Sequence, residues 1–478
     1  MTHAHPAPDA APHASAPPPA GPRPWLALAL LCAAQFMLVL DVTVVNVALP
    51  SMAADLDLGR TALTWVVTTY TLCFGGLMLL GGRLADVLGA RRTLLCGLAL
   101  FTGASLLTGL ATGPATLLAG RTAQGIGAAL LSPAALAIVT TTFHGRDRHR
   151  ALGVWSAIGG AGAAIGVLLG GVLSDGPGWE WIFYVNVPIG VALLLALPAV
   201  VPARAPRPAR LDIPGALLVT AGTGSLIYGL VAAGDTGWTD LRTLAPVAAA
   251  AVVYGAFAAV ERAQRAPLID LAVLRRRPVV AGSYLMLVAT ALLISLFFLG
   301  SVFLQEVRGY SALRTGVLFL PVAVATGVGA HLGGRVVGRW GARPTAAAGL
   351  ALAGLGTALL TGAGPAGNAW TSVALGMSVA ALGLGSVFVA ATTTALGFIA
   401  HEEAGVASGV VNTFHEVGGS IGVAVVSTVA ATGIERGTAG GFTDAFTVCA
   451  VAAVVSAAAT FVLVPRGKPL LTAGPHVH

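Results

Sequence analysis

Residues 82–92 read Gly-Arg-Leu-Ala-Asp-Val-Leu-Gly-Ala-Arg-Arg and form a charged segment between two apolar runs. A similar spacing recurs in the second half of the chain, again after the second apolar run of a block of six. The matching positions are Gly82, Asp86, Gly89 and Arg91 in the first copy and Gly334, Gly338, Gly341 and Arg343 in the second. The repeat predicts two related six-helix bundles, a plan used by many transporters. Only the first copy keeps the acidic residue.

The composition around this segment excludes a water-soluble globular protein. Of the 478 residues, 56% are hydrophobic and 9% are charged, whereas about a quarter of a soluble chain is charged. So few charges cannot cover a soluble globule, and so apolar a chain cannot stay disordered. The long continuous apolar runs lack the alternating polarity of an outer-membrane barrel. We therefore predict an all-α polytopic membrane protein.

The apolar runs between charged loops give fourteen candidate transmembrane helices. Residues 23–202 are expected to form the N-terminal six-helix bundle, and residues 276–466 the C-terminal one. Residues 203–275 would form a linker that contains two inserted helices, the seventh and the eighth. Residues 1–22 and 467–478 are expected to be tails, the first of them disordered because it is rich in Pro, Ala and His.

The basic residues predict the orientation. Most of the 26 Lys and Arg residues fall on loops and tails that share a side with the N-terminus. Those on the opposite side are Arg60, Arg242, Arg308, Arg314 and Arg436. Because cytoplasmic loops are the basic ones, both termini are expected in the cytoplasm. The protein is then a multi-pass protein of the inner (cytoplasmic) membrane.

Two ionisable residues lie inside the apolar runs of the N-terminal half. Asp41 lies deep in the first run, where an acid costs about 2.5–3.5 kcal/mol on insertion scales. We interpret it as a proton carrier; the alternatives are a packing hydrogen bond to Thr43 or Asn46, or a position near the helix end. Arg121 keeps its proton, so it must face a cavity or a partner. Its alternative role is a structural tie to a backbone carbonyl.

Polar residues of the first, fourth and thirteenth helices are candidates for a substrate cavity. Glu416 could be a second proton site or a contact for a cationic substrate, or it could lie near the inner helix end. The neighbouring His415 can titrate near neutral pH, whereas His331 is expected to be a packed polar residue. The cavity candidates are Thr43, Asn46, Gln124, Asn412 and His415.

Glycines of the fifth helix recur at intervals of three and four residues, which lets another helix approach closely. These glycines are Gly159, Gly162, Gly166, Gly170 and Gly171. The four cysteines lie within apolar runs, so we expect no disulfide. The chain has neither a phosphate-binding GxxxxGK[ST] loop nor zinc-ligand spacing. We therefore expect no enzymatic activity, no metal and no cofactor, with a proton gradient as the energy source.

Five segments in register carry a resemblance to a known family. Residues 82–92 resemble the signature between helices 2 and 3 of the major facilitator superfamily. Residues 40–50, 120–127, 159–171 and 179–190 are similar to segments of its fourteen-helix drug:proton antiporter branch. The surroundings of His415 and Glu416 depart from the family, which often has other polar residues there.

The resemblance implies a role for each segment. Asp41 and Arg121 would take part in proton coupling, with Glu416 as a further candidate. The fifth-helix glycines would set the direction of export and limit proton leak. The charged loop would hold one conformation of the transport cycle through Gly82, Asp86, Gly89, Arg91 and Arg92.

The sequence therefore predicts a proton-coupled antiporter that exports drugs, antibiotics or other small amphiphilic compounds, cationic or neutral, by alternating access. One alternative is a dedicated exporter of a single metabolite, and another is a membrane receptor or scaffold without transport activity. The expected partners are the small-molecule substrate, protons and the lipid bilayer, without nucleic acid. We expect the protein to work as a monomer.

Overall fold

The computed structural model describes residues 24–143, 145–202, 212–264, 275–364, 368–396 and 404–466. These residues are nearly all helical. Ten helical segments among them are long and apolar enough to cross a membrane. One of the ten, Arg60–Gly109, contains two helices that a π-helical turn joins end to end. These residues therefore have the helical, membrane-spanning character that the composition predicts.

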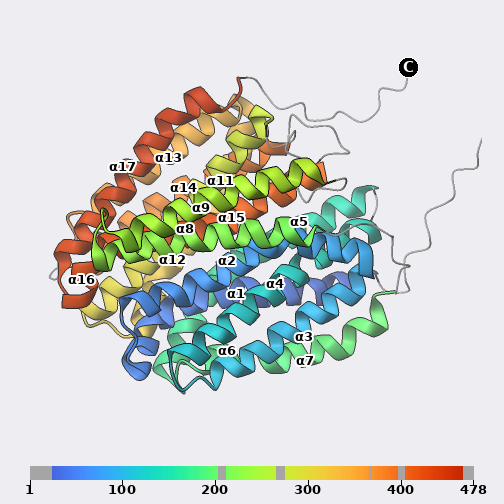
Figure 1. The fold of residues 1–478 in the computed structure, drawn as a ribbon, viewed down its shortest axis with the longest axis horizontal. Helices are drawn as coiled ribbons and strands as arrows, with labels where there is room; N and C mark the ends of the chain where they lie inside the picture. Colours follow the sequence, from blue (N-terminus) through green and yellow to red (C-terminus); the bar gives the residue numbers. More distant parts are fainter. Residues whose placement is uncertain are drawn as a thin grey trace, which may run out of the picture.

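The first group of helices packs around α4 and α1 (Figure 1). α4 contacts α2 and α3, α1 contacts α5, and α3 also contacts α7. The elements are α1 (Pro24–Leu56), α2 (Arg60–Leu84), η1 (Ala85–Gly89), α3 (Ala90–Gly109), α4 (Pro114–Thr142), α5 (Gly145–Asp175), α6 (Trp181–Tyr184) and α7 (Asn186–Val200).

The second group repeats this arrangement. α14 contacts α12 and α13, α11 contacts α15, and α13 contacts α17, in the same order as in the first group. The elements are α11 (Arg277–Val302), η2 (Phe303–Val307), α12 (Ala312–Trp340), α13 (Ala342–Leu360), η3 (Trp370–Ala374), α14 (Leu375–Leu396), α15 (Ala404–Val429), α16 (Ala431–Arg436) and α17 (Ala439–Leu463).

The sequence repeat has a direct counterpart in the backbone. Gly89 precedes α3 and Gly341 precedes α13, and both glycines have φ 91°. Side chains other than glycine rarely adopt this left-handed region. The chain uses it to turn from one long helix into the next at equivalent places in the two groups. The spacing shared by the two charged segments thus encodes the same turn.

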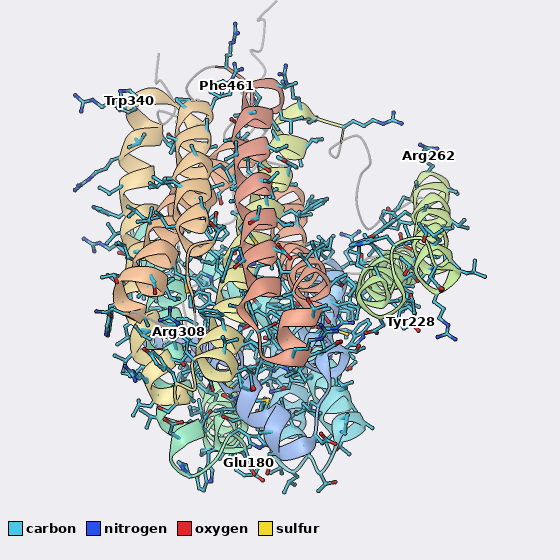
Figure 2. All side chains as sticks on the ribbon, turned by 90° about the vertical axis from the view of Figure 1, so that its left-hand side faces the viewer. Glu180, Tyr228, Arg262, Arg308, Trp340 and Phe461 are labelled. Carbon is cyan, nitrogen blue, oxygen red and sulfur yellow. The ribbon has the colours of Figure 1, made fainter. Side chains whose placement is uncertain are left out.

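The helices α8 (Ile213–Thr236) and α9 (Leu241–Ala263) form a pair at one side of the molecule (Figure 2). α8 packs against α2 and α15, and thus touches both groups. Ile227 of α8 is buried in an apolar cluster with Leu72 of α2 and Ala424 of α15. α9 packs mainly against α8, which leaves side chains such as Val252 exposed.

The two groups meet along two seams, α2 with α15 and α5 with α12. In the first seam, Thr71 and Ser420 are joined through their hydroxyl groups. In the second seam, glycines allow the backbones to touch: a Cβ atom added to Gly316 would lie 2.4 Å from the carbonyl oxygen of Val167. Because such contacts tolerate no larger side chain, α5 and α12 are closely packed at this level.

Candidate functional site

A buried ion pair joins α1 and α4. The Arg121 Nη1 atom lies 2.6 Å from the Asp41 Oδ2 atom, and the two side chains are 2% and 1% exposed. An isolated charge in such an environment would cost several kcal/mol. The opposite charge offsets this cost, which explains how both residues are tolerated inside apolar helices.

Amide side chains complete the surroundings of Asp41. The Asp41 Oδ1 atom accepts hydrogen bonds from Gln124 Nε2 at 3.1 Å and from Asn186 Nδ2 at 3.4 Å. Gln124 also donates to the Ser105 hydroxyl at 2.8 Å and accepts from Arg121 Nη1 at 2.9 Å. The cluster therefore ties together α1, α3, α4 and α7. Thr43 and Asn46 instead donate to carbonyls of their own helix.

Arg121 has further partners on α2. Its Nε atom donates to the Val66 carbonyl oxygen at 3.1 Å. Its guanidinium carbon lies 4.4 Å from the centre of the buried Tyr70 ring, close enough for a cation–π interaction. The sequence leaves two kinds of contact open for Arg121, a partner side chain and a backbone carbonyl. The structure shows both, the ion pair with Asp41 and the hydrogen bond to Val66.

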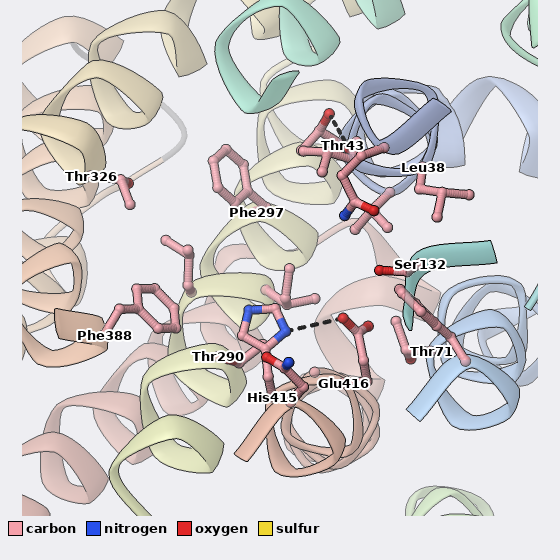
Figure 3. A pocket seen from close by; sticks show the side chains of 18 of the residues that line it. Leu38, Thr43, Thr71, Ser132, Thr290, Phe297, Thr326, Phe388, His415 and Glu416 are labelled. Atoms are coloured by element: carbon pink, nitrogen blue, oxygen red, sulfur yellow. Dashed lines mark hydrogen bonds and ion pairs between the residues drawn. The ribbon is translucent and has the colours of Figure 1, made fainter. Parts of the chain in front are cut away.

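A cavity of 660 Å³ lies between the two groups of helices (Figure 3). Most of its lining is apolar or aromatic, including Phe74, Trp155, Phe297 and Phe388. Among the described residues, the ionisable side chains in the lining are His415 and Glu416. The His415 Nδ1 atom lies 3.1 Å from Glu416 Oε1, and the pair projects into the space from α15.

The structure divides the candidate residues between the cavity and the buried cluster. The residues in the cavity lining are Thr43, Asn46, Asn412, His415 and Glu416. Asp41, Arg121 and Gln124 are outside it. Gln124, which the sequence places among the cavity residues, is fully buried because its amide is engaged by Asp41, Arg121 and Ser105.

Helix rotation explains the position of Asp41. The cavity residues of α1, such as Leu38, Val42 and Asn46, recur at intervals of four and mark one face of the helix. Asp41 falls on a different face, which meets α4 and α7. Glu416 therefore lines the cavity, whereas Asp41 does not.

The sequence does not single out the hydroxyl residues Thr71, Ser132, Thr290 and Thr326 of the described lining, nor its amide residue Gln35. Hydroxyl side chains are common in helices, where they donate to their own backbone, as Thr326 does to Val322 at 3.0 Å. No local signal separates a cavity threonine from a packing threonine.

The glycines of α5 contact two different helices. Gly162, Gly166 and Gly170 face α1; a Cβ atom added to Gly166 would lie 1.8 Å from the Thr43 Oγ1 atom. Gly171 faces α12, with Ala312 O only 2.7 Å from an added Cβ. Gly159 belongs to α5, but its packing is not among the described features. One motif thus joins α5 both to its own group and to the other.

The charged loop lies at one end of the molecule. Asp86, in η1, is exposed and forms no ion pair with a described residue. Arg91 is half-buried and Arg92 is exposed at the start of α3. A Cβ atom added to Gly82 would reach Pro133 of α4 only at 3.8 Å.

The opposite end holds contacts between the groups. Asp175, the last residue of α5, accepts hydrogen bonds from the backbone N–H groups of Ala312 and Leu313 at 2.9 Å each. A carboxylate at the N-terminus of a helix is stabilising. In the other seam at this end, the buried Arg60 of α2 pairs with Asp235 of α8 and, at 3.5 Å, with Glu435 of α16. Polar contacts therefore join the two groups of helices at this end.

Comparison with known proteins identifies the family. The family model described as Major Facilitator Superfamily matches residues 31–423. The chain belongs to the Major Facilitator Superfamily. This membership confirms the resemblance that the five segments carry.

Several relatives of this superfamily member are named for resistance or export. The puromycin resistance protein of Streptomyces alboniger is 40% identical, covering 85% of this chain and 82% of its own length. The cephamycin export protein of Amycolatopsis lactamdurans is 40% identical, covering 85% of both chains. The multidrug resistance protein Stp of Mycobacterium tuberculosis H37Rv is 36% identical, covering 83% of this chain and 74% of its own.

Solved structures share the fold of this superfamily member. A peptide transporter in complex with sulfate has a TM-score of 0.65 at 18% identity, covering 91% of this chain and 94% of its own. A bacterial homologue of the lysosomal transporter Spinster, inward-facing and unoccupied, has a TM-score of 0.63 at 18% identity, covering 92% and 97%. Likeness at this identity concerns the fold alone.

Proposed function

We propose that this chain is a proton-coupled antiporter that exports drugs, antibiotics or other small amphiphilic compounds by alternating access. The observation that carries the proposal is a 660 Å³ cavity between two similar groups of helices, with a buried acid–base pair beside it. The relatives named for puromycin resistance and cephamycin export support the direction of transport.

In this proposal the end that holds Asp175 and Arg60 faces outside, and the loop with Asp86 faces the cytoplasm. The contacts of Asp175 with α12 keep the outer end shut in the conformation described. A rocking motion of one group against the other would break them and close the cytoplasmic end. The charged loop, with Gly82, Asp86 and Arg91, would then hold the closed cytoplasmic end.

Asp41 carries the proton in this mechanism. Arg121 stays charged throughout, so protonation of Asp41 removes the charge that holds the two side chains together. The amides of Gln124 and Asn186 can still donate to the neutral acid. Because α1 lines the cavity through Val42 and Asn46, loosening the α1–α4 pair changes the cavity wall. A proton taken up outside and released inside would drive substrate outward.

The proposal also covers the number and grouping of the transmembrane helices. Counting α6 with α7 and η3 with α14, we infer fourteen transmembrane helices in the part of the chain described. The bundles would span residues 23–202 and 276–466, with α8 and α9 inserted between them, both termini in the cytoplasm and a monomer as the working unit. The close packing of the α5 glycines would limit proton leak.

A dedicated exporter of a single metabolite is the second candidate. It is favoured by relatives whose names mention one compound each, puromycin and cephamycin. The mechanism would be the same, and only the breadth of the substrates would differ. A panel of chemically unrelated compounds separates the two, because a dedicated exporter responds to one chemical class.

The test uses purified protein in liposomes with a trapped pH-sensitive dye and an imposed proton gradient. Cationic dyes, antibiotics and neutral amphiphiles are added in turn to wild type and to Asp41→Asn. We expect substrate-dependent proton flux in wild type and none in the variant. Normal flux in Asp41→Asn would refute the coupling role of Asp41. Substrate movement down its own gradient without protons would refute antiport.

A further inference from the structure

The charge of the cavity resides in two adjacent residues of α15. Figure 3 shows the Glu416 carboxylate and the His415 ring side by side, with 3.1 Å between Oε1 and Nδ1. The Glu416 side chain is 13% exposed and that of His415 is 40% exposed. No Asp, Lys or Arg accompanies them among the lining residues that the structure describes. The pair is therefore the electrostatic feature that a substrate meets.

The other ionisable groups on the described helices around α15 lie outside the cavity lining. Asp41 of α1 pairs with Arg121, and the buried Tyr70 ring of α2 lies under the same guanidinium. The Tyr70 hydroxyl has no hydrogen-bond partner among the described residues and lies within electrostatic range of both Asp41 and Glu416. Tyr284 of α11 hydrogen-bonds to Ser456, Asp235 of α8 pairs with Arg60, and Asp444 is exposed in the second turn of α17. On α12 and α14, the described lining residues are uncharged. His415 is thus the base that faces Glu416 in the described part of the cavity.

Aromatic rings surround this pair. The Phe388 ring centre lies 5.7 Å from that of His415, and Phe74, Trp155 and Phe297 also line the cavity. Aromatic faces attract cations and pack against apolar groups. The lining thus combines one carboxylate with a wall suited to a cation that has an apolar or aromatic body.

We propose that His415 and Glu416 form the subsite for the positive charge of the substrate, and that a proton on His415 releases it. The inference rests on the proposed export function and adds the substrate class, an organic monocation. When His415 is neutral, its Nδ1–H group donates to Glu416 and the pair carries one negative charge. The carboxylate then binds the cation of the substrate.

A proton from water on the acidic side enters the ring at Nε2. The imidazolium and the carboxylate then neutralise each other, so the substrate loses its counter-charge and leaves. Histidine changes charge between about pH 5 and 8, which suits this exchange. A proton and a monocation thus compete for the same negative charge, separately from the buried pair of Asp41 and Arg121.

The test measures equilibrium binding to the purified full-length chain in detergent by fluorescence anisotropy. The probe is rhodamine 6G, whose positive charge does not change between about pH 5 and 8, so a pH effect comes from the protein. Nile red is the neutral comparison. Because a hydrogen bond or ion pair to a charged group is worth a factor of about ten or more, we expect rhodamine 6G to bind about tenfold more tightly at the upper end of this pH range.

Two variants separate the roles of the pair. Glu416→Gln should weaken rhodamine 6G about tenfold at neutral pH and leave Nile red binding unchanged, which also shows that the variant is folded. His415→Asn should keep the neutral-pH affinity and remove the pH difference. The matched control is His331→Asn, since His331 is exposed on α12 outside the cavity lining; it should keep the pH difference.

Several results would overturn the inference: unchanged rhodamine 6G affinity in Glu416→Gln, a persistent pH difference in His415→Asn, or no binding of rhodamine 6G to wild type at either pH. Proton flux in liposomes remains a separate test. Flux with neutral compounds but no pH-dependent cation binding would refute the subsite and leave the export function standing. The expected binding without any flux would support the subsite and refute proton-coupled export.

Discussion

The substitution Asp41→Asn preserves the shape of the side chain but removes the charge that opposes Arg121. Both carboxylate oxygens of Asp41 accept hydrogen bonds, Oδ2 from Arg121 and Oδ1 from Gln124 and Asn186. An asparagine has one acceptor oxygen, so either orientation of its amide points an NH₂ group at a donor. Arg121 cannot lose its proton and stays charged, although its side chain is only 2% exposed.

Removing one partner of a buried pair costs about 3–5 kcal/mol. At an unfolding entropy of about 2.1 cal/mol/K per residue, this corresponds to a decrease in Tm of about 4 °C. Arg121→Gln should cost less, because Asp41 keeps two amide donors and can become neutral by taking up a proton. The double variant leaves no charge, so its Tm should exceed the additive value, with a coupling of about 1–3 kcal/mol.

Thermal unfolding of the purified variants in one detergent measures these differences. The matched control is Asp444→Asn, the same chemical change at an exposed acid of α17, which should leave Tm unchanged within about 1 °C. A larger loss in Arg121→Gln than in Asp41→Asn would refute the reasoning. So would a double variant whose loss equals the sum of the two single losses.

Three further predictions concern the packing and the outer contacts. Gly166→Ala should lower Tm because it forces a Cβ atom against α1, at a cost of about 1–3 kcal/mol. The control is Gly103→Ala, where a Cβ atom meets nothing within 4 Å, and it should be neutral. Equal losses of Tm in both variants would contradict this. Asp175→Ala removes the carboxylate cap of α12, worth about 1 kcal/mol, and should raise the labelling rate of a cysteine introduced at the outer end. Arg60→Gln should also raise that rate, because α2, α8 and α16 lose their shared cation, and an unchanged rate would show that the contact does not hold the end closed.

The sequence identified the family and the candidate residues by local features. Five segments within residues 40–190 carried the resemblance, and the spacing shared around Gly89 and Gly341 predicted two related bundles. The structure adds that the backbone turns in the same way at both glycines. Asp41 and Arg121 stood out because charges are rare and costly in apolar helices. Each of these signals depends on composition or on neighbours within a few residues.

The sequence by itself determined that this is a helical membrane protein of the Major Facilitator Superfamily, since hydrophobicity and motif spacing are local properties. The tertiary structure alone decided that Asp41 and Gln124 belong to a buried cluster whereas Glu416 faces the cavity. The physical reason is that the rotation of each helix about its axis is set by packing against all of its neighbours. The position of a residue along an apolar run sets the depth of its side chain in the membrane. It does not determine which residues of the other helices that side chain contacts.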